Sequence, residues 1–99
     1  MMEYDIVWTK KARDDYFEII DFLLQEWNEK VAGNFRIKVE NYLSLISGMP
    51  RLCPETKEVK KLRRCVISKQ VSMYYFSDKN KKEIQILRFY DNRKEKIIL

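Results

Sequence analysis

The side chains best suited to chemistry are cations and aromatic rings in the second half of the chain. These cationic and aromatic residues are Lys60, Lys61, Arg63, Arg64, Tyr74, Tyr75, Phe76, Arg88, Phe89, Tyr90 and Arg93. Guanidinium groups pair bidentately with phosphate, and aromatic rings stack on unpaired bases. Such a mixture is typical of surfaces that bind RNA or DNA, and it equally suits an acidic, partly disordered protein that adds a strand or helix to the domain.

The same residues also have a purely structural interpretation. Tyr75 and Phe89 would then be core residues, and the arginines would be solvated. For each aromatic ring taken singly we favour a place in the core, whereas for the arginines as a group we favour a binding surface.

The chain contains no histidine, which excludes Ser-His-Asp and Cys-His nucleophilic catalysis and most zinc sites. Cys53 and Cys65 cannot complete a four-ligand zinc site, so we expect neither a metal nor a cofactor. In a reducing compartment we expect both cysteines to be free thiols. RNA cleavage remains chemically possible, because lysine and arginine stabilise charge on phosphate while a tyrosine or carboxylate relays a proton.

Charge is distributed unevenly along the sequence. Residues 1–50 hold six Lys/Arg and nine Asp/Glu, whereas residues 51–99 hold fourteen Lys/Arg and six Asp/Glu. The formal net charge is +5. A basic half on one small domain attracts polyanions or an acidic protein.

A length of 99 residues predicts a single domain covering residues 1–99. The longest apolar stretch, Ile19 to Leu24, is interrupted by Asp21, so we expect no contact with a membrane. The first residues contain no basic leader followed by an apolar stretch, so we expect a cytoplasmic protein.

The first half of the sequence predicts a strand and two helices. Glu3 to Trp8 alternates weakly between apolar and polar positions, as in a strand. Thr9 is a suitable cap for a helix that extends to Trp27 with apolar residues at three- and four-residue steps. Asn28 ends that helix and caps a second one from Glu29 to Ser47, in which Gly33 permits close packing. The short break predicts an antiparallel helical hairpin.

After Gly48 the periodicity changes. Residues 48–58 contain both prolines and predict a loop. Three strands are then expected at Lys61–Ser68, Val71–Ser77 and Glu83–Tyr90, joined by short turns as an antiparallel meander. The expected fold is α+β with the order β-α-α-β-β-β, in which the helical hairpin packs on one face of a mostly antiparallel, twisted, four-stranded sheet. The opposite face is then free to carry function.

This order, with its basic meander, resembles the RelE/ParE superfamily of toxins, the toxin halves of type II toxin–antitoxin, or plasmid stabilisation, modules. The stretches that carry the resemblance are Tyr4–Thr9, Phe22–Trp27, Leu62–Val66, Val71–Tyr75 and Ile84–Arg93. In this superfamily the RelE-like group cleaves mRNA in the ribosomal A site, and the ParE-like group inhibits DNA gyrase.

The resemblance favours the ParE-like side. Arg63 and Cys65 stand where the mRNA-cleaving group has lysines, and Ser72 stands where it usually has an arginine. Arg93 matches the arginine after the last strand, but no tyrosine or histidine follows it. Asp91 stands where ParE-like members often have a histidine.

The resemblance therefore implies a growth-inhibiting toxin that binds a gyrase-like target without catalysis. It also implies a cognate antitoxin with an acidic, flexible segment, which neutralises the toxin in a toxin–antitoxin hetero-oligomer. The expected binding residues are Lys60, Lys61, Arg63, Arg64, Arg88, Asp91 and Arg93.

Two alternatives stay open. The first is a ribosome-dependent mRNA endoribonuclease with an altered active site. Its catalytic residues would be Arg63, Arg88 and Arg93 on phosphate and Tyr74 or Tyr90 in proton transfer. The second is a degenerate, inactive interaction domain.

Overall fold

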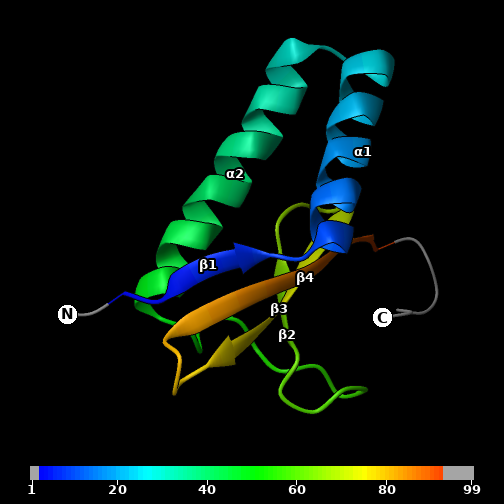
Figure 1. The fold of residues 1–99 in the computed structure, drawn as a ribbon. Coiled ribbons are helices and arrows are strands. Elements are labelled where there is room, and N and C mark those ends of the chain that lie inside the picture. Colours follow the sequence, from blue (N-terminus) through cyan, green and yellow to red (C-terminus); the bar gives the residue numbers. More distant parts are fainter. Residues whose placement is uncertain (1–2, 93–99) are drawn as a thin grey trace.

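A twisted sheet and a helical hairpin make up the two layers of the molecule (Figure 1). The computed structural model describes residues 3–92. The strands are β1 (Asp5–Trp8), β2 (Arg63–Val66), β3 (Val71–Asp78) and β4 (Glu83–Asp91), and their order in the sheet is β1-β4-β3-β2. β1 runs parallel to β4, and the other neighbours are antiparallel. The predicted α+β fold and its element order are confirmed.

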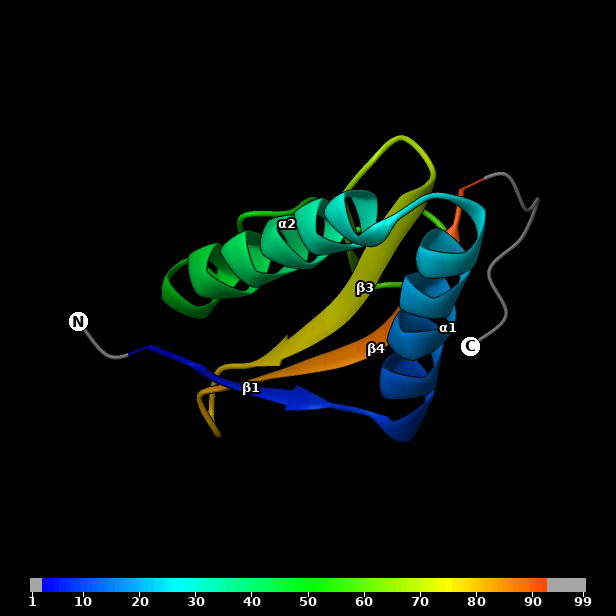
Figure 2. The same cartoon turned by 90° about the horizontal axis from the view of Figure 1, so that it is seen from above.

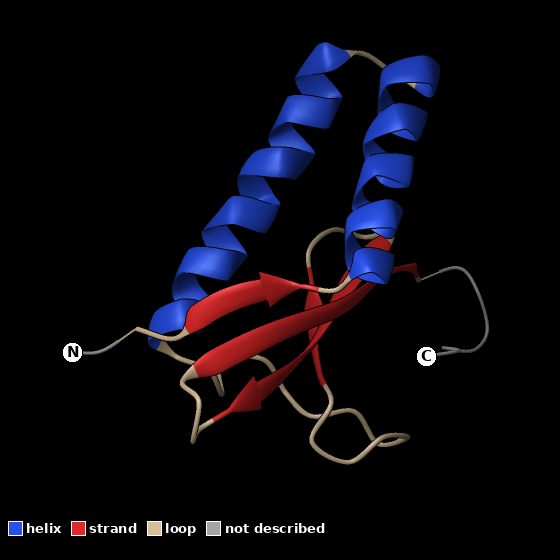
Figure 3. Cartoon of the chain, viewed as in Figure 1, coloured by secondary structure: helices blue, strands red, loops and turns tan. Residues whose placement is uncertain are grey.

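Both predicted helix caps are present. α1 (Lys10–Glu26) begins after Thr9, whose hydroxyl accepts a hydrogen bond from the Ala12 amide at 3.0 Å. α2 (Glu29–Gly48) begins after Asn28, whose side chain accepts from the Val31 amide at 2.9 Å. Seen from above, the two helices cover the same face of the sheet (Figure 2). Their connected ends extend beyond it (Figure 3).

The core lies between this hairpin and the covered face of the sheet. Its largest fully buried members include Ile46 of α2, Tyr75 of β3 and Ile86 of β4. Phe89 is also buried, so the structural interpretation of Tyr75 and Phe89 is confirmed. The alternation of side chains along β3 and β4 directs a second set away from the helices, to the face that we call the outer face.

The segment between α2 and β2 differs from the prediction. The expected strand Lys61–Ser68 is shorter at both ends in the structure, where β2 spans Arg63–Val66. At the start, Lys61 has a left-handed backbone, with φ at 67°, and at the end the amides of Ile67 and Ser68 donate to the Val71 carbonyl in the turn. In α2, a Cβ atom added to Gly33 would meet no neighbouring atom within 4 Å, so this glycine does not serve close packing.

Among residues 3–92 no helix is long and apolar enough to cross a bilayer.

Cys53 and Cys65 form a disulfide, so the expectation of free thiols is wrong. The loop after α2 returns along the free side of β2, where Pro54 accepts a hydrogen bond from the Arg64 amide at 3.0 Å. This return brings the two Cα atoms to 5.3 Å, within the range that a disulfide requires. The link encloses the loop that follows Cys53 and fastens it to the sheet.

Candidate functional site

Arg63 is held by the loop that precedes β2. One of its guanidinium nitrogens, Nη1, donates to the carbonyl oxygens of Cys53 at 2.7 Å and Arg51 at 3.4 Å. Its Nη2 lies 3.7 Å from a carboxylate oxygen of Glu55. With 13% of its side chain exposed, Arg63 stabilises the loop from within.

Arg88 is paired with α1. Its Nε and Nη2 donate to the two carboxylate oxygens of Asp15 at 2.6 and 3.1 Å. The hydrogen bond with Asp15 is the largest of the causes that raise the pKa of Arg88 above its ordinary value. Both side chains are mostly buried, so this guanidinium serves first to attach α1 to β4.

Arg64 has different surroundings. Its Nε donates to the Ser72 hydroxyl at 2.8 Å, and its Nη2 donates to the side-chain oxygen of Asn92 at 3.2 Å. Ser72 in turn donates to the same Asn92 oxygen, and Asn92 donates to the Lys69 carbonyl at 3.2 Å. Neutral acceptors therefore orient this guanidinium on the outer face.

Two tyrosines lie beside Arg64 on the same face. The rings of Tyr74 and Tyr90 meet edge to face, with centroids 6.5 Å apart. Burial raises the pKa of Tyr74, although the nearby charge of Arg64 lowers it in part. A buried hydroxyl of this kind retains its proton near neutral pH, so Tyr74 is poorly suited to act as a general base.

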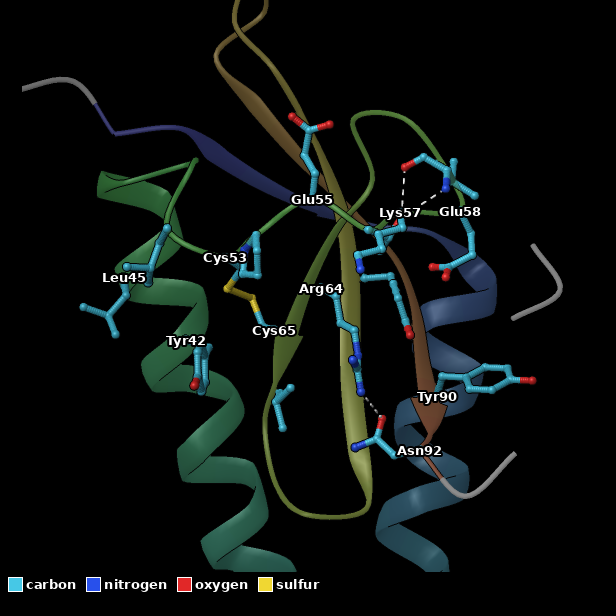
Figure 4. Close-up of a pocket in the computed structure, with 16 residues that line it drawn as sticks. Tyr42, Leu45, Cys53, Glu55, Lys57, Glu58, Arg64, Cys65, Tyr90 and Asn92 are labelled. Atoms are coloured by element: carbon cyan, nitrogen blue, oxygen red, sulfur yellow. Dashed lines mark hydrogen bonds between the residues drawn. A yellow bond between two sulfur atoms is a disulfide. The ribbon is translucent and has the colours of Figure 1, made fainter. Parts of the chain in front are cut away.

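A cavity of about 1140 Å³ opens beside these residues and continues around the edge of β2. We call it the β2 cavity. On the outer face it is lined by Arg64, Tyr74, Tyr90 and Asn92, and on the helical side by Tyr42 and Leu45. Leu52 and Val66, both exposed, also line it. Figure 4 shows Arg64 and Tyr90 on one side of the disulfide and Tyr42 and Leu45 on the other.

The remaining predicted residues are dispersed. Lys60 and Lys61 lie exposed in the loop before β2, where the Lys61 amide donates to Glu55. Asp91 ends β4, opposite Val71 of β3. Arg93 lies outside the described residues. The structure thus gathers Arg64, Tyr74 and Tyr90, whereas Arg63 and Arg88 are engaged elsewhere.

Sequence reasoning missed Ser72 and Asn92 as parts of this group. Asn92 follows Tyr90 by two positions, just after the end of β4, and this spacing is the signal that could have placed both on one face. The sequence marks Ser72 only as a replacement for an arginine. Among the described residues, no three Cys, Asp or Glu side chains are grouped so that they could hold a metal ion.

Comparison with known families gives one match that spans most of the sequence. Residues 6–95 match the model of the ParE toxin of the type II toxin–antitoxin system parDE. A search of curated protein sequences found no significant match.

Solved structures with the same fold come from several bacteria. The chromosomal ParDE system from P. aeruginosa contains a chain with a TM-score of 0.74 and 20% identity, and the alignment covers 92% of this chain and 98% of that one. A YoeB/ParE toxin from Agrobacterium tumefaciens has a TM-score of 0.66 and 13% identity, with 89% and 98% covered. A chain of the toxin–antitoxin complex RelBE2 from Mycobacterium tuberculosis has a TM-score of 0.62 and 17% identity, with 91% and 99% covered. At these identities the likeness concerns the fold.

Proposed function

The chain belongs to the ParE toxin family of type II toxin–antitoxin systems, and we propose that it inhibits growth by binding a cellular target rather than by cutting RNA. The observation that carries this proposal is the engagement of two arginines. RNA cleavage needs several cations that converge on one phosphate. Arg63 is instead bound to loop carbonyls, and Arg88 is bound to Asp15.

The burial of Tyr74 supports the same proposal. A proton acceptor must lie within reach of the ribose hydroxyl and lose its own proton easily. Tyr74 is almost fully buried and its pKa is raised, which opposes that role. We therefore propose DNA gyrase, the target implied by the ParE-like resemblance, over the ribosome.

We also propose that a cognate antitoxin with an acidic, flexible segment neutralises the chain. The P. aeruginosa structure is described as a ParDE system and the M. tuberculosis structure as a RelBE2 toxin–antitoxin complex, so chains of this fold occur with antitoxins. The basic second half of the sequence suits an acidic partner.

Two assays test the target. The purified chain should inhibit supercoiling by purified gyrase, and the effect should disappear when the product of the adjacent gene is added. After induction in bacteria, primer extension on translated mRNAs should reveal no discrete cuts. Growth arrest without gyrase inhibition, even at a large excess of the chain, would contradict the gyrase target.

Ribosome-dependent cleavage of mRNA is the second candidate. The observation that favours it is Arg64, which lies beside two tyrosines at an open cavity. Under this alternative, cuts should appear in translated messages and should be lost in an Arg64→Ala variant.

A further inference from the structure

Arg64 is the one arginine of β2 and β4 for which the described part of the chain provides no carboxylate within ion-pair distance. Arg63 lies near Glu55 and Arg88 near Asp15, whereas the side chains that accept hydrogen bonds from Arg64 within residues 3–92 are the neutral ones of Ser72 and Asn92. A guanidinium is always charged, and it keeps five N–H donors in a planar fork. Because two of its nitrogens are already fixed, Arg64 is oriented for an anion before any ligand arrives.

The surroundings of Arg64 favour a carboxylate over a nucleic acid. A nucleic acid carries a charge at each nucleotide, and its binding relies on several phosphate contacts. Here Glu55, which is paired with Arg63, and Glu58 line the same cavity, and their carboxylates would oppose a run of phosphates more strongly than a single carboxylate. Apart from Thr56 and Lys57, the other lining side chains are largely apolar, and they include Tyr42, Leu45, Leu52, Val59 and Val66. An acidic residue flanked by apolar residues matches this lining better.

The edge of β2 indicates how such a segment would lie. The Arg64 amide donates to Pro54, so it points away from β3 toward the free side of the strand. By the two-residue period, the backbone of Val66 faces the same side, and Val66 is 50% exposed. An extended segment added there would direct alternate side chains to the two faces of the sheet. One set would meet Arg64, and the other would meet Tyr42 and Leu45.

We propose that Arg64 anchors a carboxylate of the antitoxin, which lies along β2 at Val66 as an extended segment of alternating acidic and apolar residues. The acidic residue faces the outer face, and its apolar neighbours occupy the part of the β2 cavity beside α2. This inference rests on the proposed neutralisation by an antitoxin and specifies its contact.

The first test measures the affinity of the purified chain for the product of the adjacent gene by calorimetry. Arg64→Gln should weaken binding roughly tenfold to a hundredfold, because the carboxylate loses its charged partner. Lys57→Gln is the matched control, since Lys57 is an exposed cation that lines the same cavity. It should change the affinity less than about threefold. Equal losses in both variants would indicate a diffuse charge effect and overturn the anchor.

A second pair of variants does not depend on removing Arg64. Val66→Glu places a carboxylate beside Arg64 at an exposed position, where it should occupy the guanidinium and weaken binding roughly tenfold. Val66→Gln has the same size without the charge, and it should bind distinctly more tightly than Val66→Glu. Equal affinities of these two variants would overturn the inference.

The outcomes separate this inference from the proposed function. If the unchanged chain and all variants bind the gene product equally, the anchor is wrong and neutralisation by an antitoxin stands. If the unchanged chain does not bind it at all, the antitoxin proposal fails and the anchor fails with it. A short single-stranded RNA serves as the competing probe, and RNA binding that Arg64→Gln abolishes would reassign the site to phosphate.

Discussion

Both carboxylate oxygens of Asp15 on α1 accept hydrogen bonds from the guanidinium of Arg88 on β4, although the two residues are 73 positions apart in the chain. The same carboxylate accepts a hydrogen bond from the Phe89 amide at 3.1 Å. β1 pairs with β4 only as far as Ile86, so this amide lies beyond the last paired position. Asp15 thus provides the hydrogen-bond acceptor for a β4 amide that has no partner in β1.

We expect Asp15→Ala to destabilise the protein by about 3 kcal/mol, because it leaves a mostly buried guanidinium and a strand amide without their acceptor. Denaturant unfolding checks this value. Asp14→Ala is the control, since its ion pair with Lys10 is exposed and should be worth less than about 0.5 kcal/mol. A loss for Asp15→Ala as small as that of the control would show that the pair contributes little.

We expect Tyr75 to make the folded protein less stable at alkaline pH. Burial raises the pKa of its hydroxyl, which donates to the Pro50 carbonyl at 2.7 Å. In the unfolded chain this tyrosine loses its proton at about pH 10, whereas in the folded protein it keeps the proton to a higher pH. The free energy of unfolding therefore falls as the pH rises from the pKa of the unfolded state to that of the folded state. Thermal unfolding from about pH 8 to about pH 11 should show a shallower decline for Tyr75→Phe. An unchanged slope would refute the assignment to Tyr75.

The disulfide predicts a measurable response to reductant. Closing the loop between Cys53 and Cys65 should contribute about 3 kcal/mol by the chain-entropy estimate. We expect the reduced protein to remain folded at a lower Tm, because Tyr75 and Arg63 still hold the loop. The Cys53→Ala/Cys65→Ala variant should unfold at a Tm that reductant does not change. Equal Tm values for oxidised and reduced protein would argue against the link.

Arg63 should prove to be a structural residue. We expect Arg63→Ala to cost about 2 kcal/mol, because the buried Cys53 carbonyl loses a charged donor. If the chain acts without catalysis, gyrase inhibition per folded molecule should stay close to that of the unchanged chain. Circular dichroism and the supercoiling assay measure the two effects separately. Full loss of inhibition in a folded Arg63→Ala protein would place Arg63 at the target.

Local sequence signals were enough to predict the fold. Thr9 and Asn28 cap the helices as their side chains allow, and the change from helical to two-residue periodicity after Gly48 marks the meander correctly. The short links between the last three strands predict their antiparallel pairing. These features depend on residues that lie close together in the sequence, so the sequence alone is enough to predict them.

The candidate site was harder to predict, because its groups are sorted by distant contacts. Nothing near Arg88 in the sequence indicates that Asp15 lies against it. The pairing of Cys53 with Cys65 likewise depends on where the loop returns. The arginines of the second half look equivalent in sequence, but in the part of the chain that the structure describes Arg63 and Arg88 each pair with a carboxylate and Arg64 does not.

The loop that returns along β2 also bears on self-association. A bare sheet edge is a template on which identical chains can stack into fibrils. Glu55 forms an isolated bridge with Arg63, the Thr56 amide donates to the Leu62 carbonyl and the Arg64 amide donates to the Pro54 carbonyl, so the loop occupies this edge from Leu62 to Arg64. The loop therefore protects this edge from pairing with a second copy of the chain. The disulfide that holds the loop in place should accordingly lower the tendency of the protein to polymerise.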